Sequence, residues 1–181
     1  MSGADTGATP SAAVPRDDAA AARAWAAAAA VPDPEVPCVT VADLGILRGV
    51  EVRGRVAIAR LTPTYSGCPA VLEIERAVAR ALAAAGFEAR VERVLSPAWT
   101  SDWIGPEARE KLRAHGIAPP VCTTREAGAE RAISFFDRRE PRCPRCGSGD
   151  TETLSEFGST ACKAQHRCRA CREPFDHFKP F

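Results

Sequence analysis

Strong net charge, long apolar runs and export signals are all missing from this sequence of 181 residues. A formal net charge of +1 gives no general attraction to nucleic acid or to an anionic membrane. The apolar run at residues 24–31 is mostly alanine and is much shorter than the roughly 18 residues that a bilayer span requires. Asp17 and Asp18 stand where an export signal would carry positive charge. The sequence therefore predicts a cytoplasmic protein that binds neither membrane nor nucleic acid.

Motifs of oxygen-activating and redox enzymes are also absent. The sequence has no Glu-x-x-His pair for a di-iron site, and no glycine-rich dinucleotide fingerprint follows a strand. The three histidines that could act as a base for a thiol enzyme, His115, His166 and His177, all lie in the second half of the chain. We therefore expect no activity of the chain's own, with a thiol enzyme left open as an alternative.

The composition divides the chain into four parts. We expect a disordered tail at residues 1–17, an α+β domain at 18–116, a linker or extra strand at 117–138 and a zinc ribbon at 139–181. The first part is rich in Ser, Gly, Ala, Thr and Pro without periodicity. The predicted fold class is thus a small two-layer α+β domain followed by a β zinc ribbon.

Helix and strand patterns alternate within the α+β domain. The predicted elements are a helix at 18–30, two strands within 45–61, a helix at 70–85, a strand at 87–95 and a helix at 106–115. We expect Trp25 to anchor the first helix on the core, and Gly86 and Gly116 to end the later two. This order implies helices packed on one face of a small mixed sheet.

Two C-x-x-C pairs in the last part predict a metal site. They consist of Cys143, Cys146, Cys168 and Cys171. Their spacing is typical of a zinc ribbon, in which two turns each present two thiolates to one zinc ion. A redox dithiol pair and a rubredoxin-like iron site are the alternatives. Four thiolates leave zinc no open position for water, so the predicted metal is structural and not catalytic.

Other residues of the ribbon are open to two interpretations. Cys162 and His166 could replace a ligand, but we prefer a buried thiol and a surface imidazole. Phe175, Phe178 and Phe181 either form a docking surface or cover the small core of the ribbon itself. From residue 139 onward, eight Lys or Arg stand against six Asp or Glu, so the charge favours contact with protein over nucleic acid.

A separate thiol, Cys68, lies just before the predicted helix at 70–85. The positive end of a helix dipole lowers the pKa of a nearby thiol, and Pro69 suits the first helical position. Cys68 is therefore either a reactive or metal-binding thiolate or a cysteine that only packs. Asp33 and Glu35 are either loop carboxylates near that thiol or solvated acids.

Three segments together resemble the SufT-like family of iron–sulfur cluster assembly domains. They are D-P-E-V-P at 33–37, D-L-G at 43–45 and T-P-T-Y-S-G-C-P at 62–69. The resemblance implies a small two-layer α+β fold and a functional role for Cys68. It also implies that Asp33 and Glu35 belong to the acidic segment of the family.

Further segments are similar to one branch of that family, the D subunits of phenylacetyl-CoA epoxidase systems. They are S-P-A-W-T-S-D-W-I at 96–104, L-R-A-H-G-I-A-P-P at 112–120 and S-E-F-G-S-T-A-C-K-A at 155–164. The similarity covers residues 33–181 and leaves Cys38 and Cys122 unassigned. It implies two partners in aerobic phenylacetate catabolism: a di-iron oxygenase that forms the ring epoxide, and a reductase with a flavin and an iron–sulfur cluster.

The function that this resemblance implies is maturation of the epoxidase. Cys68, with Asp33 and Glu35, would hold iron or an iron–sulfur cluster transiently, while the zinc ribbon docks the client. An integral, non-redox structural subunit of the epoxidase is the alternative, and a nucleic-acid-binding ribbon protein is disfavoured by the charge balance. The sequence leaves open which component is the client, and whether the chain is a monomer or a homodimer.

Overall fold

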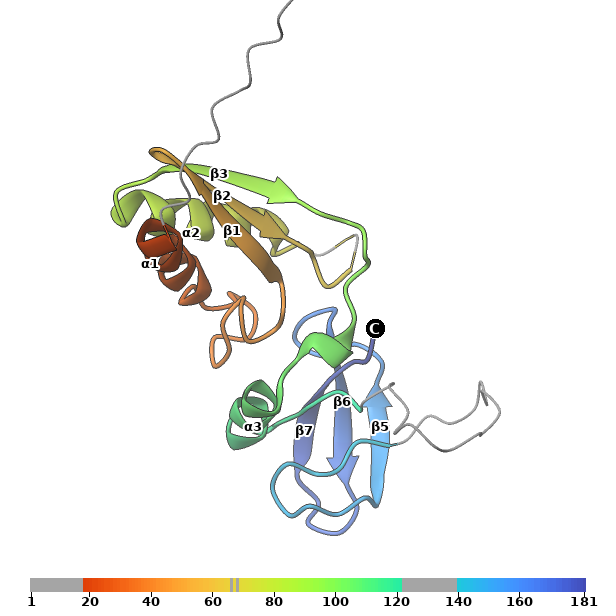
Figure 1. The fold of residues 1–181 in the computed structure, drawn as a ribbon. Coiled ribbons are helices and arrows are strands. Elements are labelled where there is room, and N and C mark those ends of the chain that lie inside the picture. The colour runs from red at the N-terminus through yellow and green to blue at the C-terminus, as the bar shows by residue number, and fades with distance from the viewer. Residues whose placement is uncertain (1–17, 66, 68, 122–139) are drawn as a thin grey trace, which may run out of the picture.

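The computed structural model describes residues 18–65, 67, 69–121 and 140–181, and its strands form two sheets in two halves of the molecule (Figure 1). The elements of the first half are α1 (Asp18–Ala29), β1 (Leu47–Arg53), β2 (Val56–Leu61), α2 (Val71–Ala84) and β3 (Glu88–Arg93). β1 pairs antiparallel with β2, and β2 pairs parallel with β3. The parallel pair needs a crossover, which α2 supplies.

Residue periodicity explains why these elements form and how they pack. On β2, Ala57, Ala59 and Leu61 alternate with half-buried residues and are buried. On α2, the buried residues are Ile74, Val78 and Leu82, which are spaced four apart and so share one helix face. The α+β fold predicted from the sequence is therefore confirmed, with both helices on one side of the sheet (Figure 1).

Two details of the helices differ from the prediction. Trp25 is 42% exposed and does not anchor α1, which instead buries Ala20, Ala24 and Ala28. The small side chains on that face let the helix approach the core closely. Trp25 directly follows Ala24, and successive residues of a helix are rotated by about 100°, so its side chain points away from the buried face. Pro69 precedes the N-cap residue Ala70 and is therefore not in the first helical position.

The second half is built around a sheet that is mainly antiparallel. Its elements are η1 (Ser101–Trp103), α3 (Pro106–Ala114), β4 (Ile117–Ala118), β5 (Thr151–Ser155), β6 (Lys163–Cys168) and β7 (Pro174–Phe178). The strand order is β4-β7-β6-β5, with β4 parallel to β7. Residues 117–118 thus belong to this sheet, while 1–17 and 122–139 lie outside the described residues. The predicted division into four parts stays a prediction.

The D-L-G and S-P-A-W-T-S-D-W-I segments pack against each other. The indole N–H of Trp99 donates to the carbonyl oxygen of Leu44 at 2.8 Å in a buried position. Gly45 has φ +68, and a Cβ there would lie 2.8 Å from the Cβ of Trp103. Glycine is therefore required both by the backbone and by the close approach. These motif residues fasten the connecting segment onto the first half.

The three late phenylalanines lie in three environments. Phe175 is buried in a small core of the ribbon, whereas Phe178 is 1% exposed and belongs to the main core, beside Trp99. Phe181 is 41% exposed, and its ring stacks on Tyr65 with a centroid distance of 5.8 Å. The C end accordingly lies at the junction between the halves (Figure 1). Phe175 and Phe178 therefore cover cores within the chain, whereas Phe181 stays partly exposed.

None of the helices in the part of the chain that the structure describes is long and apolar enough to cross a membrane.

Candidate metal centre and the cleft between the two halves

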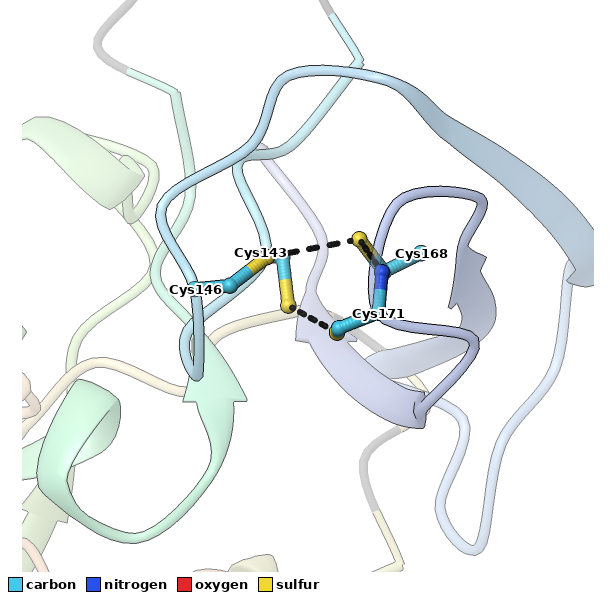
Figure 2. A group of neighbouring side chains, drawn as sticks. All are labelled: Cys143, Cys146, Cys168 and Cys171. Atoms are coloured by element: carbon cyan, nitrogen blue, oxygen red, sulfur yellow. Dashed lines mark hydrogen bonds between the residues drawn. The ribbon is translucent and has the colours of Figure 1, made fainter.

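Four cysteine side chains from two turns converge at one end of the second sheet (Figure 2). Cys143 and Cys146 lie before β5, Cys168 ends β6, and Cys171 lies in the turn to β7. The Sγ atoms are 3.7 Å apart for Cys143 and Cys171, and 3.5 Å apart for Cys146 and Cys168. All four lie within 4.8 Å of one another. Zinc–sulfur bonds of about 2.3 Å in a tetrahedron place sulfurs about 3.8 Å apart, so the group fits such an ion.

The two turns share one backbone design. A residue with positive φ directly follows the second cysteine of each: Gly147 with φ +75 and Arg172 with φ +65. The amide of the first cysteine donates to the carbonyl five residues later, at 2.9 Å for Cys143 and 3.0 Å for Cys168. Arginine is unusual in the left-handed region, where it costs about 1–2 kcal/mol. This tight turn aims both thiols of each pair inward.

The environment of the thiols favours metal binding. The amide of Cys171 donates to the Sγ of Cys168 at 3.5 Å, and this bond is the largest of the causes that lower the pKa of Cys168 to about 7, whereas the pKa values of Cys146 and Cys171 are raised by burial and by the neighbouring thiols. A thiol that deprotonates near neutral pH is ready to bind a metal ion. The surrounding buried cluster holds four residues, of which two are cysteines: Ala118, Cys143, Cys168 and Phe175. So little apolar burial stabilises this end only weakly without an ion.

Neither Cys162 nor His166 belongs to this group of four. His166 is buried, so the predicted surface imidazole is wrong. Its ring stacks on Phe175 at 5.7 Å and meets His177 edge-on at 5.2 Å. The reason is its position on β6, where the alternation of side chains places it on the buried face of the sheet, directly across from Phe175 of β7. Cys162 is a buried thiol, which was the preferred interpretation. It directly precedes β6, whereas Cys168 lies at the other end of that strand.

That opposite end forms a cleft together with the first half. Asp33 lies in it at 7% exposure, and its Oδ1 accepts the amides of Glu35 at 2.8 Å and Val36 at 2.9 Å. Burial raises the pKa of Asp33, although these two hydrogen bonds oppose the shift. The D-P-E-V-P segment is therefore a tight turn that holds Glu35 beside a buried carboxyl group.

Cys162 meets this turn from the ribbon. Its Sγ lies 3.7 Å from Oε2 of Glu35 and 3.1 Å from Oγ1 of Thr160, and the residue is 5% exposed. Burial raises the pKa of Cys162, and the nearby carboxylates of Glu35 and Asp33 raise it further. At neutral pH the side chain is thus a protonated thiol that donates to the Glu35 carboxylate.

The remaining walls of the cleft are mostly apolar. The apolar lining comes from Val36, Leu44, Ile46, Leu61, Val71, Ile74 and Phe178. Glu75 and Arg93 at its rim pair with each other at 2.7 Å. An apolar cleft with a few convergent polar groups is the usual form of a binding site.

Asp33 and Glu35 thus lie next to each other and also line the same cleft as Cys162 of the ribbon. Cys68 lies outside the described residues, so its role stays a prediction, although Pro63 and Thr64 of the same loop line the cleft. Sequence reasoning missed the contact between Glu35 and Cys162, which are 127 positions apart. The only signal for it was the similarity of the segment around Cys162 to the branch described above.

Comparison with known proteins gives matches to both halves. Residues 21–95 match the family described as iron–sulfur cluster assembly protein, and residues 127–179 match the PaaD zinc beta ribbon domain. A crystal structure of a DUF59 domain from Bacillus anthracis, of unknown function, is 25% identical, with a TM-score of 0.45. The match covers 52% of this chain and 92% of that one.

A relative from Escherichia coli (strain K12) resembles almost the whole chain. It is provisionally named as the D component of a 1,2-phenylacetyl-CoA epoxidase, and it is 47% identical over 156 residues, which are 86% of this chain and 90% of the relative. Identity of that degree over that length establishes common descent and common architecture. The chain therefore belongs to the PaaD family, the D subunits of phenylacetyl-CoA epoxidases.

Proposed function

We propose that this protein is an accessory subunit of the phenylacetyl-CoA 1,2-epoxidase that assists assembly of iron or an iron–sulfur cluster in the oxygenase or the reductase. Membership of the PaaD family and the match to an iron–sulfur cluster assembly domain support this role. The observation that carries most weight is the cleft, where Asp33 and Glu35 meet a buried cysteine thiol. Carboxylates and thiols are the side chains that a transient iron site needs.

In this proposal the ribbon has a structural and a docking role. A zinc ion on Cys143, Cys146, Cys168 and Cys171 holds the ribbon, whose small core cannot do so alone. Leu154 and Phe157 are exposed apolar side chains on this half, which suits contact with another protein. These thiolates need a reducing compartment, so we propose that the protein works in the cytoplasm.

Surface charge gives no support to nucleic-acid binding by the ribbon. Four cations of the described part of the ribbon form ion pairs within the chain: Arg145 pairs with Glu173, Arg167 and Arg169 pair with Glu152, and Lys163 pairs with Asp176. Nucleic-acid binding depends on free cations aligned with phosphates. A protein client, the oxygenase or the reductase, is the more consistent partner.

The experiment that tests this role replaces Cys68 with serine. The oxygenase and reductase are then purified from cells that make the variant, and their iron content and epoxidase activity are measured. We expect under-loaded, less active components, with Cys38→Ser as the matched control that loads them fully. Fully loaded components from the Cys68→Ser cells would contradict a maturation role centred on that thiol.

A second candidate is an integral structural subunit without redox chemistry. The exposed Leu154 and Phe157 suit that role equally well, since both roles need a protein interface. Co-purification separates the two. An integral subunit elutes with the oxygenase in fixed stoichiometry during gel filtration, whereas a maturation factor leaves the loaded enzyme.

A further inference from the structure

We propose that Phe181 of the ribbon positions the loop at residues 62–69 by stacking on Tyr65, and so controls how fast the thiol of Cys68 reacts. Phe181 is a positioning residue in this proposal, because it acts through Tyr65 and not on the reacting atoms. Cys68 itself lies outside the described residues, whereas Tyr65 and Gly67 of the same loop are described. The inference rests on the proposed function and deepens it, because it assigns a residue that orders the loop of the proposed thiol.

The ring of Tyr65 contacts both the ribbon and its own loop. The ring of Phe181 stacks on it, with a centroid distance of 5.8 Å and an angle of 12° between the ring planes. A Cβ added to Gly67 would lie 3.7 Å from Cε2 and 3.9 Å from Cδ2 of Tyr65, so the backbone of Gly67 runs close to the same ring. Gly67 directly precedes Cys68 in the sequence. Tyr65 therefore connects the ribbon to the residue next to the proposed thiol.

Contacts on the ribbon side hold Phe181 in place. The amide of Lys179 donates to the carbonyl oxygen of Cys162 at 2.9 Å. The carbonyl oxygen of Phe181 accepts the amide of Ser101 at 3.2 Å. The ring of Phe181 also meets the ring of Trp99 edge-on, with a centroid distance of 6.1 Å. The backbone and the ring of Phe181 are thus each fixed, so the ring faces Tyr65 in a defined orientation.

Support from the first half decreases along the loop. Thr62 and Thr64 are buried. Tyr65 is half-buried, and Gly67 is exposed. The stack on Phe181 therefore lies where burial of the loop ends. A stacked aromatic pair contributes about 1 kcal/mol, which corresponds to about a fivefold change in the equilibrium between an ordered and a disordered loop. The alternative is that Phe181 only covers apolar surface, in which case any apolar side chain of similar size would serve.

Alkylation of the zinc-loaded full chain by iodoacetamide tests the proposal, with the rate at each cysteine measured by peptide mass spectrometry over a range of pH. We expect Phe181→Ala to move the rate constant of Cys68 by about fivefold toward its value in the urea-unfolded chain, and its pH profile in the same direction. Phe181→Tyr keeps the ring and should react like the unchanged chain. Phe181→Leu keeps an apolar side chain without the ring and should react like Phe181→Ala.

Two references separate positioning from general loosening of the fold. Cys38, a half-buried thiol of the first half, should keep its rate in every variant. Phe157→Ala removes an exposed phenylalanine of the ribbon and should leave the rate of Cys68 unchanged. The proposal is overturned if Phe181→Ala or Phe181→Leu leaves the rate of Cys68 unchanged, or if Cys38 and Cys68 change together. It is also overturned if Cys68 reacts alike in the folded and the urea-unfolded chain.

The alkylation rates and the loading of the epoxidase fail independently of each other. If the rate of Cys68 depends on Phe181 as expected but Cys68→Ser cells make fully loaded epoxidase, the positioning stands and the proposed maturation role falls. If Cys68→Ser cells make under-loaded epoxidase but the Phe181 variants leave the rate of Cys68 unchanged, the maturation role stands and this inference falls.

Discussion

Truncation of Phe178 to alanine removes a side chain from the ribbon that is buried in the main core. Its ring is 1% exposed and lies 6.3 Å from the ring of Trp99, which in turn hydrogen-bonds to Leu44. Loss of a fully buried phenylalanine costs about 3–5 kcal/mol, because both the transfer energy and the energy of the remaining cavity are lost. We expect Phe178→Ala to lower the free energy of unfolding by this amount, out of a total of about 5–15 kcal/mol for a typical domain.

Urea unfolding of the zinc-saturated chain, followed by tryptophan fluorescence and circular dichroism, measures this loss. Phe181→Ala is the matched control, because it removes the same ring from a position that is 41% exposed. Its ring contacts with Tyr65 and Trp99 are worth about 1 kcal/mol. Equal losses in the two variants would refute the conclusion that Phe178, and not the tail as a whole, anchors the ribbon in the main core.

Three other perturbations test separate parts of the structure. Purified protein should carry one zinc ion per chain. Cys168→Ser should lose that ion, and its circular dichroism spectrum should show less β-sheet. A variant that retains the metal would contradict the assigned ligands. Burial, aided by His166, lowers the pKa of His177 to about 4, so the folded chain favours the neutral ring. That stabilisation, about 3 kcal/mol at most, is present above pH 6.5 and is lost as the pH falls toward 4. In His177→Phe, the free energy of unfolding should therefore fall less steeply between pH 6.5 and pH 4 than in the unchanged chain. Because acid also releases zinc from both proteins, the measured quantity is the difference between the two free energies at each pH. Gly45→Ala should cost about 1–3 kcal/mol more than Gly86→Ala, because both have positive φ but only the former meets Trp103; equal thermal midpoints would speak against that contact.

Local patterns in the sequence predict the local structure well. The alternation of Val50 and Val52 with polar residues predicts the hairpin, and the four-residue spacing of Ile74 and Val78 predicts α2. Gly86 has the positive φ of a helix-ending residue. The C-x-x-C spacing likewise predicts which four cysteines come together. The helix, hairpin and turn signals lie within a few residues along the chain, where backbone geometry dictates the outcome, whereas the two cysteine pairs, 22 residues apart, are brought together by their shared demand for one metal ion.

Contacts between distant segments could not be predicted in this way. The exposure of Trp25 depends on which face of α1 the sheet accepts, and alanines fit that contact better. The burial of His166 depends on the pairing of β6 with β7, and the meeting of Cys162 with Glu35 depends on how the two halves dock. Hydrophobicity is non-directional, so a sequence states that a surface must be covered but not by which partner.

β6 spans the distance between the two sulfur sites of the ribbon. Cys162 immediately precedes this strand and Cys168 ends it, so about 20 Å of extended backbone separates the cleft from the four-cysteine group. The register of β6 against β7 fixes both ends at once, and a slip of one residue would turn every side chain of the strand to the opposite face. β6 therefore fixes the spacing between the four-cysteine group at one end and Cys162 at the other, so a change of register would displace Cys162 from Glu35 as well as Cys168 from its partners.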